Sequence, residues 1–280
     1  MLKIFFLIFA YFVMSITPST AQNNVNDITV GTSHSMKSEF LDETRPYWVH
    51  LPPNYDPDEK YPVMYLLDAR FHFNYTAGYL DILPFDGKIK QTILVAVPNT
   101  NRFRDLTPTH SDNGLDGKGI EFFAQSGGGE KFLNFIKDEL VPQIEKDYST
   151  SDFRILAGHS NSGLFAMFAF LEVPHLFQAF IAVDPTLIWD NEILTKRLEE
   201  KVNKPPSSKN SIYISSANNE NDSILPPEKM KNAQARFVNI LSKWKSDSFR
   251  VKFEHLEDEN HTTSAFVGML HGLQFSFREQ

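Results

Sequence analysis

The stretch RILAGHSNSGLFAMFAF, residues 154–170, carries the strongest signal in the chain. It begins with a short apolar run that is typical of a buried strand, and it ends with helix-forming residues. Ser160 lies between the two, with Gly158 and Ser162 placed symmetrically around it. A sharp strand-to-helix turn brings those two neighbours together, so both must be small, and it lifts the serine hydroxyl out of the sheet. The stretch therefore predicts a nucleophilic serine, and a serine that only caps the helix is the alternative.

Apolar runs alternate with amphipathic segments on both sides of this stretch. Predicted strands cover residues 47–51, 63–68, 92–98, 154–158, 179–184, 211–217 and 250–256. Predicted helices cover residues 129–148, 162–173, 230–241 and 264–277. Continuous apolar strands that alternate with helices indicate a mostly parallel sheet with helices on both faces. We expect one α/β domain over residues 22–280, with its ligand site at the carboxyl ends of the strands.

The composition narrows the possible classes of function. The net charge is −8, which argues against a nucleic-acid partner because no dense cluster of Lys or Arg offsets it. The chain has no cysteine, so zinc or redox chemistry on thiolates is excluded. We expect neither a metal ion nor an organic cofactor.

The first 21 residues differ from the rest of the chain. Lys3 precedes a short apolar run over residues 4–16, and small residues at Ser19 and Ala21 precede Gln22. This is the pattern of a secretory signal peptide, with an uncleaved membrane anchor as the alternative. The run is shorter than the ~20 residues that a membrane span needs. We therefore expect cleavage before Gln22, a bacterial periplasmic or secreted location, and no membrane span in the mature chain.

A serine hydroxyl needs a base at neutral pH, and histidine is the usual one. In this class of fold the chain order is serine, acid, histidine, and the histidine follows the last strand. His255, His261 and His271 lie late enough in the chain. His255 falls inside a predicted strand and His271 inside the predicted closing helix, whereas His261 lies in a polar loop. His261 is therefore the predicted base.

The carboxylate that orients the histidine is expected after the penultimate strand. Glu220 in that loop is the first choice, Asp184 at the end of an earlier strand is the second, and Asp222 is the third. Two backbone N–H groups are expected to stabilise the oxyanion. They are those of Asn161, at a helix start, and Arg70, after the predicted central strand.

Several sequence blocks, in the same order, resemble the esterases of the esterase D and enterochelin-esterase type, which have the α/β-hydrolase fold. The resemblance spans residues 48–277 and includes VHLPPNYDPDEKYPVMYLLDA, VAVPNTNRFRDLTPTH and NHTTS. It implies Ser160 as the nucleophile and His261 as the base. It also places the oxyanion loop at Ala69 and Arg70.

Two positions depart from the family pattern. Ser162 stands where the family usually has the first of two glycines, and Asp184 stands where it usually has a serine before proline. The second departure keeps Asp184 open as the acid. The segment NRFRDLTPTH resembles one that siderophore esterases of this type place beside the active site. Arg102 and Arg104 are therefore expected to meet an anionic acyl or catecholate group, and an ion pair of Arg104 with Asp105 is the alternative.

Together these features predict a serine esterase that works through an acyl-enzyme. An acyltransferase with the same triad and an inactive binding protein with the same fold are the alternatives. The partner is expected to be a small-molecule or glycan ester. A ferric-siderophore trilactone, an acylated polysaccharide and a small aliphatic ester are all compatible with these residues.

Overall fold

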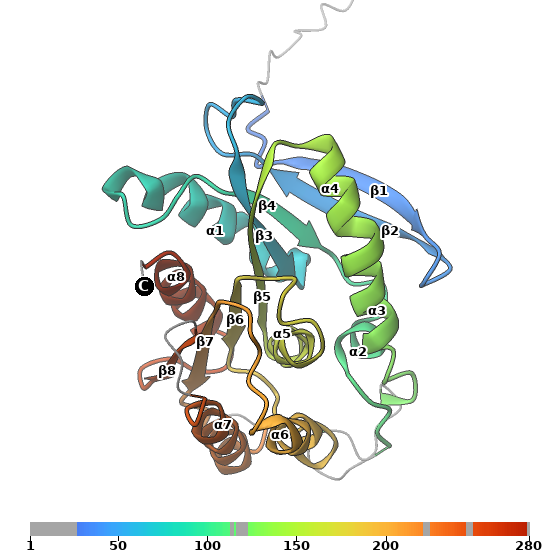
Figure 1. The fold of residues 1–280 in the computed structure, drawn as a ribbon, viewed down its shortest axis with the longest axis vertical. Helices are drawn as coiled ribbons and strands as arrows, with labels where there is room; N and C mark the ends of the chain where they lie inside the picture. The colour runs from blue at the N-terminus through green and yellow to red at the C-terminus, as the bar shows by residue number, and fades with distance from the viewer. Residues whose placement is uncertain (1–26, 113–114, 116–122, 221–224, 245–248, 279–280) are drawn as a thin grey trace, which may run out of the picture.

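The structure, a computed structural model, describes residues 27–112, 115, 123–220, 225–244 and 249–278, and its centre is an eight-stranded sheet. The predicted signal peptide lies outside the described residues. In chain order, β1 is Thr32–Ser38, β2 Glu43–His50, β3 Tyr61–Leu67, β4 Ile93–Val97, β5 Thr150–His159, β6 Ala179–Val183, β7 Asn210–Ala217 and β8 Phe249–Leu256. The strands lie side by side in the order β1-β2-β4-β3-β5-β6-β7-β8 (Figure 1). Only the pairs β1–β2 and β2–β4 are antiparallel, and the other neighbours are parallel.

Helices cover both faces of this sheet (Figure 1). One face carries α1 (Ala69–Ile82) and α8 (Ser264–Ser276). The other carries α2 (Arg102–Leu106), α3 (Gly129–Phe135), α4 (Val141–Asp147), α5 (Asn161–Glu172), α6 (Trp189–Lys201) and α7 (Pro227–Leu241). Strand β3 is apolar throughout because both of its faces are buried. Tyr65 packs into the core on one face of the sheet, and its neighbours Met64 and Leu66 pack into the core on the other. The predicted α/β fold with a mostly parallel sheet is confirmed.

The predicted helix over residues 129–148 contains a wider turn in its middle. Helices α3 and α4 are continuous through a π-helical turn at Ile136–Leu140. Pro142, in the first turn of α4, has no N–H to donate to the preceding turn, and local widening satisfies the backbone there. Within the described residues, no helix combines the length and hydropathy that crossing a membrane requires.

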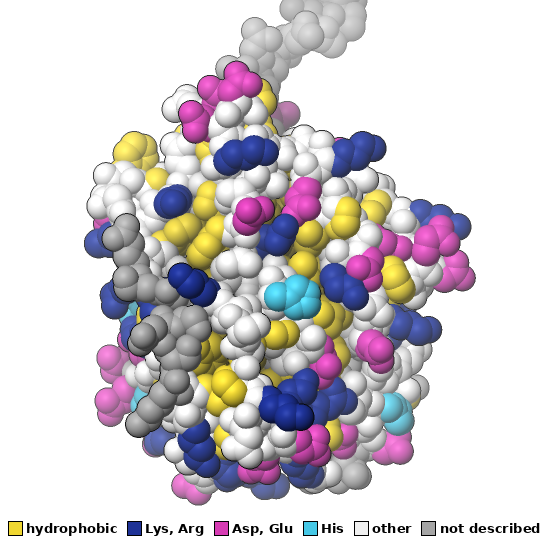
Figure 2. All heavy atoms as spheres, in the orientation of Figure 1, with side chains coloured by type: hydrophobic (Ala, Val, Ile, Leu, Met, Phe, Trp, Pro, Cys, Tyr) yellow, Lys and Arg dark blue, Asp and Glu magenta, His cyan; other side chains and the backbone are white. Residues whose placement is uncertain are grey.

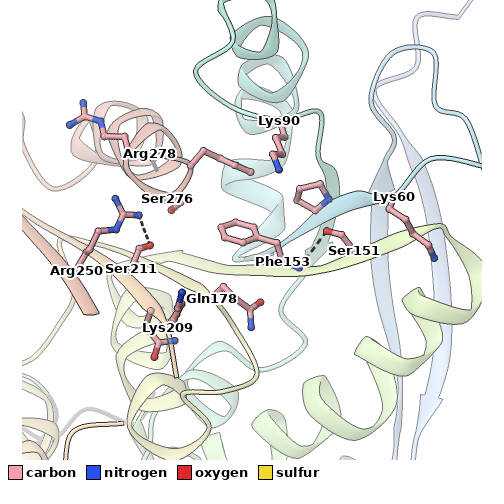
Figure 3. A pocket seen from close by; sticks show the side chains of 13 residues that line it. Lys60, Lys90, Ser151, Phe153, Gln178, Lys209, Ser211, Arg250, Ser276 and Arg278 are labelled. Carbon is pink, nitrogen blue, oxygen red and sulfur yellow. Dashed lines mark hydrogen bonds between the residues drawn. The ribbon is translucent and has the colours of Figure 1, made fainter. Parts of the chain in front are cut away.

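Parallel strands give the sheet two chemically different ends. Ser160 and Asp184 directly follow β5 and β6 at the carboxyl end. The amino ends of β3, β5, β7 and β8 surround a separate cavity with basic side chains (Figure 3). On the face seen in Figure 2, by contrast, basic and acidic side chains are interspersed.

Close packing of α8 on the sheet yields a matched pair of substitutions. A Cβ on Gly272 in α8 would lie 2.5 Å from Cγ2 of Ile181, whereas a Cβ on Gly78 in α1 would meet nothing within 4 Å. Alanine is favoured over glycine inside a helix by about 0.5–1 kcal/mol at either position. Overpacking costs about 1–3 kcal/mol. We therefore expect urea unfolding to show that Gly272→Ala lowers the free energy of unfolding and that Gly78→Ala raises it. Equal effects of the two substitutions would contradict the close contact between α8 and β6.

Candidate active site

Ser160 occupies a strained turn between β5 and α5. Its backbone has φ 61° and ψ −121°, a region that residues with a side chain rarely adopt. Two backbone hydrogen bonds hold it there, from Ser160 N to Val183 O and from Leu164 N to Ser160 O, both 2.9 Å long. A Cβ on Gly158 would lie 2.4 Å from the carbonyl group of Ser162, so the turn closes only around a glycine. This is the strand–turn–helix geometry that the sequence predicts.

Ser162, the departure from the family pattern, turns its side chain back into the same turn. Its Oγ accepts a 2.8 Å hydrogen bond from His159 N and donates another of 2.8 Å to His159 O. The residue is fully buried. The hydroxyl therefore adds two hydrogen bonds to the turn and leaves the space beside Ser160 open.

His261 links Ser160 to a buried carboxylate. Its Nε2 lies 3.0 Å from Ser160 Oγ, and its Nδ1 lies 2.6 Å from Oδ2 of Asp184. When Nδ1–H donates to the carboxylate, Nε2 is left without a proton and accepts the hydroxyl hydrogen of Ser160. These contacts bring together three side chains from the ends of β5 and β6 and from the loop after β8.

Asp184 is fully buried and accepts hydrogen bonds with both oxygens. Besides His261, its donors are Ala217 N at 3.1 Å, Asn219 Nδ2 at 2.9 Å and Gln234 Nε2 at 2.8 Å. Burial by itself raises the pKa of Asp184. The hydrogen bond and charge of His261, with the two side-chain amides, outweigh burial and hold this pKa below its ordinary value. The group is therefore a carboxylate acceptor at neutral pH.

Glu220, the first choice for the acid, is corrected by this geometry. Its side chain is exposed and its backbone N–H donates to Oδ1 of Asn218, while Nδ1 of His261 is bound to Asp184. The loop after β7 instead turns Asn219 inward, toward Asp184. The third choice, Asp222, lies outside the described residues.

The predicted pair of arginines divides between two environments. Arg102 lines the cavity beside Ser160, and its Nε and Nη2 each donate a 2.9 Å hydrogen bond to Asp68. Asp68 is buried, which by itself raises its pKa, but the charge and hydrogen bonds of Arg102 and a hydrogen bond from Asn99 hold the pKa below its ordinary value. Arg102 is therefore fixed by a buried carboxylate and remains 29% exposed toward the cavity.

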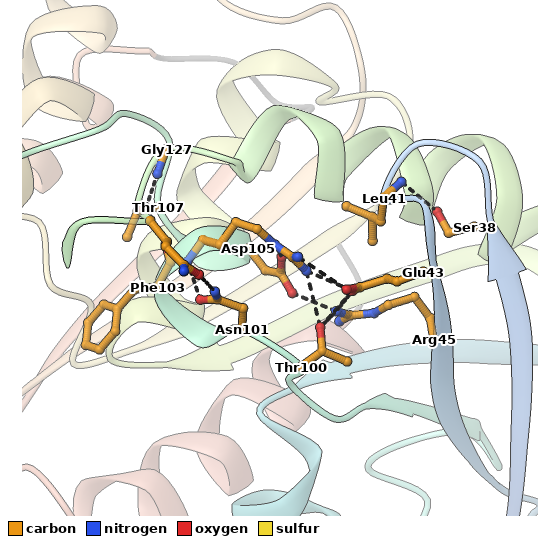
Figure 4. A network of polar contacts seen from close by, with 12 residues as sticks. Ser38, Leu41, Glu43, Arg45, Thr100, Asn101, Phe103, Asp105, Thr107 and Gly127 are labelled. Carbon is orange, nitrogen blue, oxygen red and sulfur yellow. Dashed lines mark hydrogen bonds and ion pairs between the residues drawn. The ribbon is translucent and has the colours of Figure 1, made fainter. Parts of the chain in front are cut away.

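Arg104 does not line that cavity, which corrects its predicted contact with substrate. It donates to Glu43 at 2.8 Å and to Asp105 at 2.7 Å, and the fully buried Arg45 bridges the same two carboxylates (Figure 4). Although partial burial acts to raise it, the pKa of Glu43 falls to about 2 because of the hydrogen bonds from the arginines. The alternative reading, an ion pair with Asp105, is the one that the structure shows.

A cavity of about 510 Å³ opens beside Ser160 Oγ. Its lining residues are Asp68, Phe71, His72, Tyr75, Arg102, His159, Ser160, His261, Thr262, Ala265 and Phe266. The rings of Tyr75 and Phe266 lie 4.6 Å apart, and the Phe71 side chain is 70% exposed. The wall formed by α1 and α8 is thus aromatic. It was not expected from the sequence, in which no helix was predicted over residues 69–82.

Two further histidines, His72 and His159, line the same cavity as His261 and were not predicted from the sequence as site residues. The His159 ring is 4.5 Å from the His261 ring, and its Nε2 lies 2.7 Å from the backbone oxygen of His261. Burial, together with the charges of His261 and His72, lowers the pKa of His159 to about 3, and burial lowers that of His72 to about 4. His159 is therefore neutral at pH 7, and its Nε2–H holds the His261 backbone in place.

The predicted oxyanion donors lie at the starts of two helices. Asn161 is the first residue of α5 and Arg70 is the second residue of α1. The first N–H groups of a helix have no acceptor within it and favour negative charge. The side chain of Arg70 is exposed, so only its backbone serves the predicted role. In the described part of the chain, no group of three or more His, Cys, Asp or Glu residues is arranged to hold a metal ion.

Comparison with known proteins finds similar esterases. Residues 38–271 match the family model described as "Putative esterase". The chain is 27% identical over 275 residues to the ferri-bacillibactin esterase BesA of Bacillus subtilis, an alignment that covers 93% of this chain and 94% of that protein.

Solved structures give the same result. An IroE-like serine hydrolase from Shewanella oneidensis superposes with a TM-score of 0.82 at 32% identity, covering 88% of this chain and 80% of that one. The siderophore hydrolase EstA of Aspergillus nidulans shares the fold, with a TM-score of 0.75 at 18% identity over 88% of this chain and 93% of that one. The family match, the relatives and the fold together establish that this chain belongs to the esterase family and is a carboxylic ester hydrolase with the α/β-hydrolase fold.

Proposed function

We propose that Ser160, His261 and Asp184 form a catalytic triad that hydrolyses the ester bonds of a siderophore through an acyl-enzyme. One observation carries the triad: His261 contacts Ser160 Oγ at 3.0 Å with one ring nitrogen and Asp184 at 2.6 Å with the other. This is the relation between nucleophile, base and orienting acid that acyl transfer by serine requires.

In the first step, Ser160 Oγ attacks the ester carbonyl carbon while Nε2 of His261 takes the hydroxyl proton. The buried carboxylate of Asp184 stabilises the imidazolium that forms. The backbone N–H groups of Asn161 and Arg70 donate to the oxyanion, which collapses and expels the alcohol with the proton from His261. Water then adds to the acyl-enzyme by the same route, with His261 as base. The acid leaves and Ser160 regains its proton.

The siderophore assignment rests on the cavity and on the relatives. The proteins similar to this chain include a ferri-bacillibactin esterase and an apo-salmochelin esterase. The cavity combines aromatic side chains with Arg102, whose guanidinium is partly exposed. Flat rings that carry oxygen atoms would stack on the former and accept hydrogen bonds from the latter.

We also propose that residues 1–21 direct export and that residues 22–280 form the catalytic unit. Expression of the full chain in a Gram-negative host should give a periplasmic or secreted protein whose first residue is Gln22. N-terminal sequencing of that protein is the measurement. A full-length protein that stays with the membrane fraction would favour the anchor.

Substitution of the nucleophile tests the triad directly. Ser160→Ala should lower kcat/KM for p-nitrophenyl butyrate and for enterobactin by about four to six orders of magnitude, because the acyl-enzyme no longer forms. It should also abolish labelling by a fluorophosphonate probe. Ser162→Gly, which restores the usual family residue, is the matched control and should remain labelled. Unchanged turnover by Ser160→Ala would remove the proposal, and transfer of the acyl group to an added alcohol in preference to water would make the protein an acyltransferase.

The identity of the acid is tested by a pair of amide substitutions. Asp184→Asn places an NH₂ group among donors and removes the charge that stabilises the imidazolium, so kcat should fall by about four orders of magnitude with little change in KM. Glu220→Gln should leave kcat within about twofold, because an exposed residue away from the histidine adds little. Steady-state kinetics, with thermal melting as the check on folding, separates the two. A larger effect at Glu220 than at Asp184 would reverse the assignment.

A further inference from the structure

A second cavity, of about 430 Å³, lies at the opposite end of the sheet from Ser160 (Figure 3). Its lining comes mainly from the first residues of strands, and from the end of α8. The residues are Lys60, Pro62, Lys90, Ser151, Phe153, Gln178, Lys209, Asn210, Ser211, Arg250, Ser276, Phe277 and Arg278. The seven residue steps along β5 from Phe153 to Ser160 span about 23 Å, at ~3.3 Å per residue. The cavity is therefore not part of the hydrolytic site.

The lining residues carry positive charges, and no acidic residue is among them. The basic residues are Lys60, Lys90, Lys209, Arg250 and Arg278. Among the described residues, none of these five forms an ion pair, whereas cations elsewhere do, as Arg154 does with Glu145 and Arg236 with Glu192. A cluster of unpaired cations on a chain of net charge −8 creates a local field that attracts an anion.

Arg250 is the member of the cluster that is fixed in place. Its Nη2 donates to Ser211 Oγ at 2.8 Å, and its guanidinium lies 4.9 Å from the centre of the Phe275 ring. Its Nε is buried and has no hydrogen-bond partner. Burial and the charge of Arg278 lower the pKa of Arg250. In the described part of the chain no carboxylate pairs with this partly buried guanidinium, and an anion in the cavity would act as its counter-ion.

Two phenylalanines give the cavity an apolar surface. The rings of Phe153 and Phe277 lie 5.2 Å apart at an angle of 34°, and both side chains are only half-buried. In Figure 3 the basic side chains surround Phe153. A flat ring on the ligand would cover these two side chains, with its charged group directed to the arginines.

We propose that this cavity binds a small anion that carries an aromatic ring, at a site separate from the esterase centre. Arg250 and Arg278 contact the anionic group, Lys209 and Lys90 add long-range attraction, and Phe153 contacts the ring. The proposal does not depend on the catalytic triad, since no residue is shared between the two sites.

Phenyl phosphate is a suitable probe, and isothermal titration calorimetry on the purified protein is the measurement. We expect one saturable site with a Kd below about 1 mM that weakens as salt is added. Inorganic phosphate, which lacks the ring, and phenol, which lacks the charge, should each bind at least about tenfold more weakly. Absence of saturable binding by phenyl phosphate would overturn the proposal, and equal binding of inorganic phosphate would overturn the aromatic part.

Variants locate the binding. Arg250→Gln should weaken phenyl phosphate at least about tenfold, and the exposed Lys209→Gln should weaken it severalfold without disturbing the fold. Two control substitutions should leave the Kd unchanged. They are Lys229→Gln, at another exposed lysine, on α7, and Arg102→Gln, in the other cavity. If Arg102→Gln lost binding while the Lys209 and Arg250 variants kept it, the probe would lie in the esterase cavity. That result would overturn the proposal.

Discussion

The geometry of the candidate active site depends on one buried anion, the carboxylate of Asp184. Burial of an unpaired carboxylate costs several kcal/mol, and the cost is offset only if every acceptor position is satisfied. The donors come from the end of β7, from the loop after it, from α7 and from the loop after β8. Those two loops are also joined by the hydrogen bond from Asn218 N to Glu259 O. Segments far apart in sequence thus meet at the Asp184 carboxylate. Of these donors, only His261 can also exchange a proton at neutral pH.

A second buried carboxylate, Asp68, lines the cavity that opens beside Ser160. The two anions are similar in burial, but their partners differ: Asp184 binds an imidazole and Asp68 binds a guanidinium. An imidazole transfers protons at neutral pH, whereas a guanidinium remains charged. In the proposed triad, Asp184 therefore orients the group that exchanges a proton with Ser160. Asp68 instead holds a permanent positive charge, that of Arg102, at the edge of the cavity beside Ser160.

Local signals in the sequence predicted the parts of the protein that short segments determine. The buried strands have the apolar runs expected of them, and the turn at Ser160 follows from the small residues around it. The contact between Asp184 and His261 was only the second expectation, because Asp184 has a backbone at φ 40° that the sequence does not reveal. The other features depend on long-range contacts that short segments do not determine. Strand β1 was not predicted because it has the polar sequence of an edge strand. Arg102 and Arg104 are two residues apart on one short helix, yet they point toward different carboxylates.

Helix α8 connects the two cavities, because Ala265 and Phe266 line one and Ser276 and Phe277 line the other. Between these ends, Gly268 and Gly272 allow close contact with Val183, Ile181 and Tyr213 in the sheet. A site transmits its occupancy to another only through an element with two arrangements of similar free energy. A helix packed so closely that a methyl group would clash has little room for a second arrangement. The packing of α8 therefore argues that an anion at the amino ends of the strands binds without altering the geometry of Ser160 and His261.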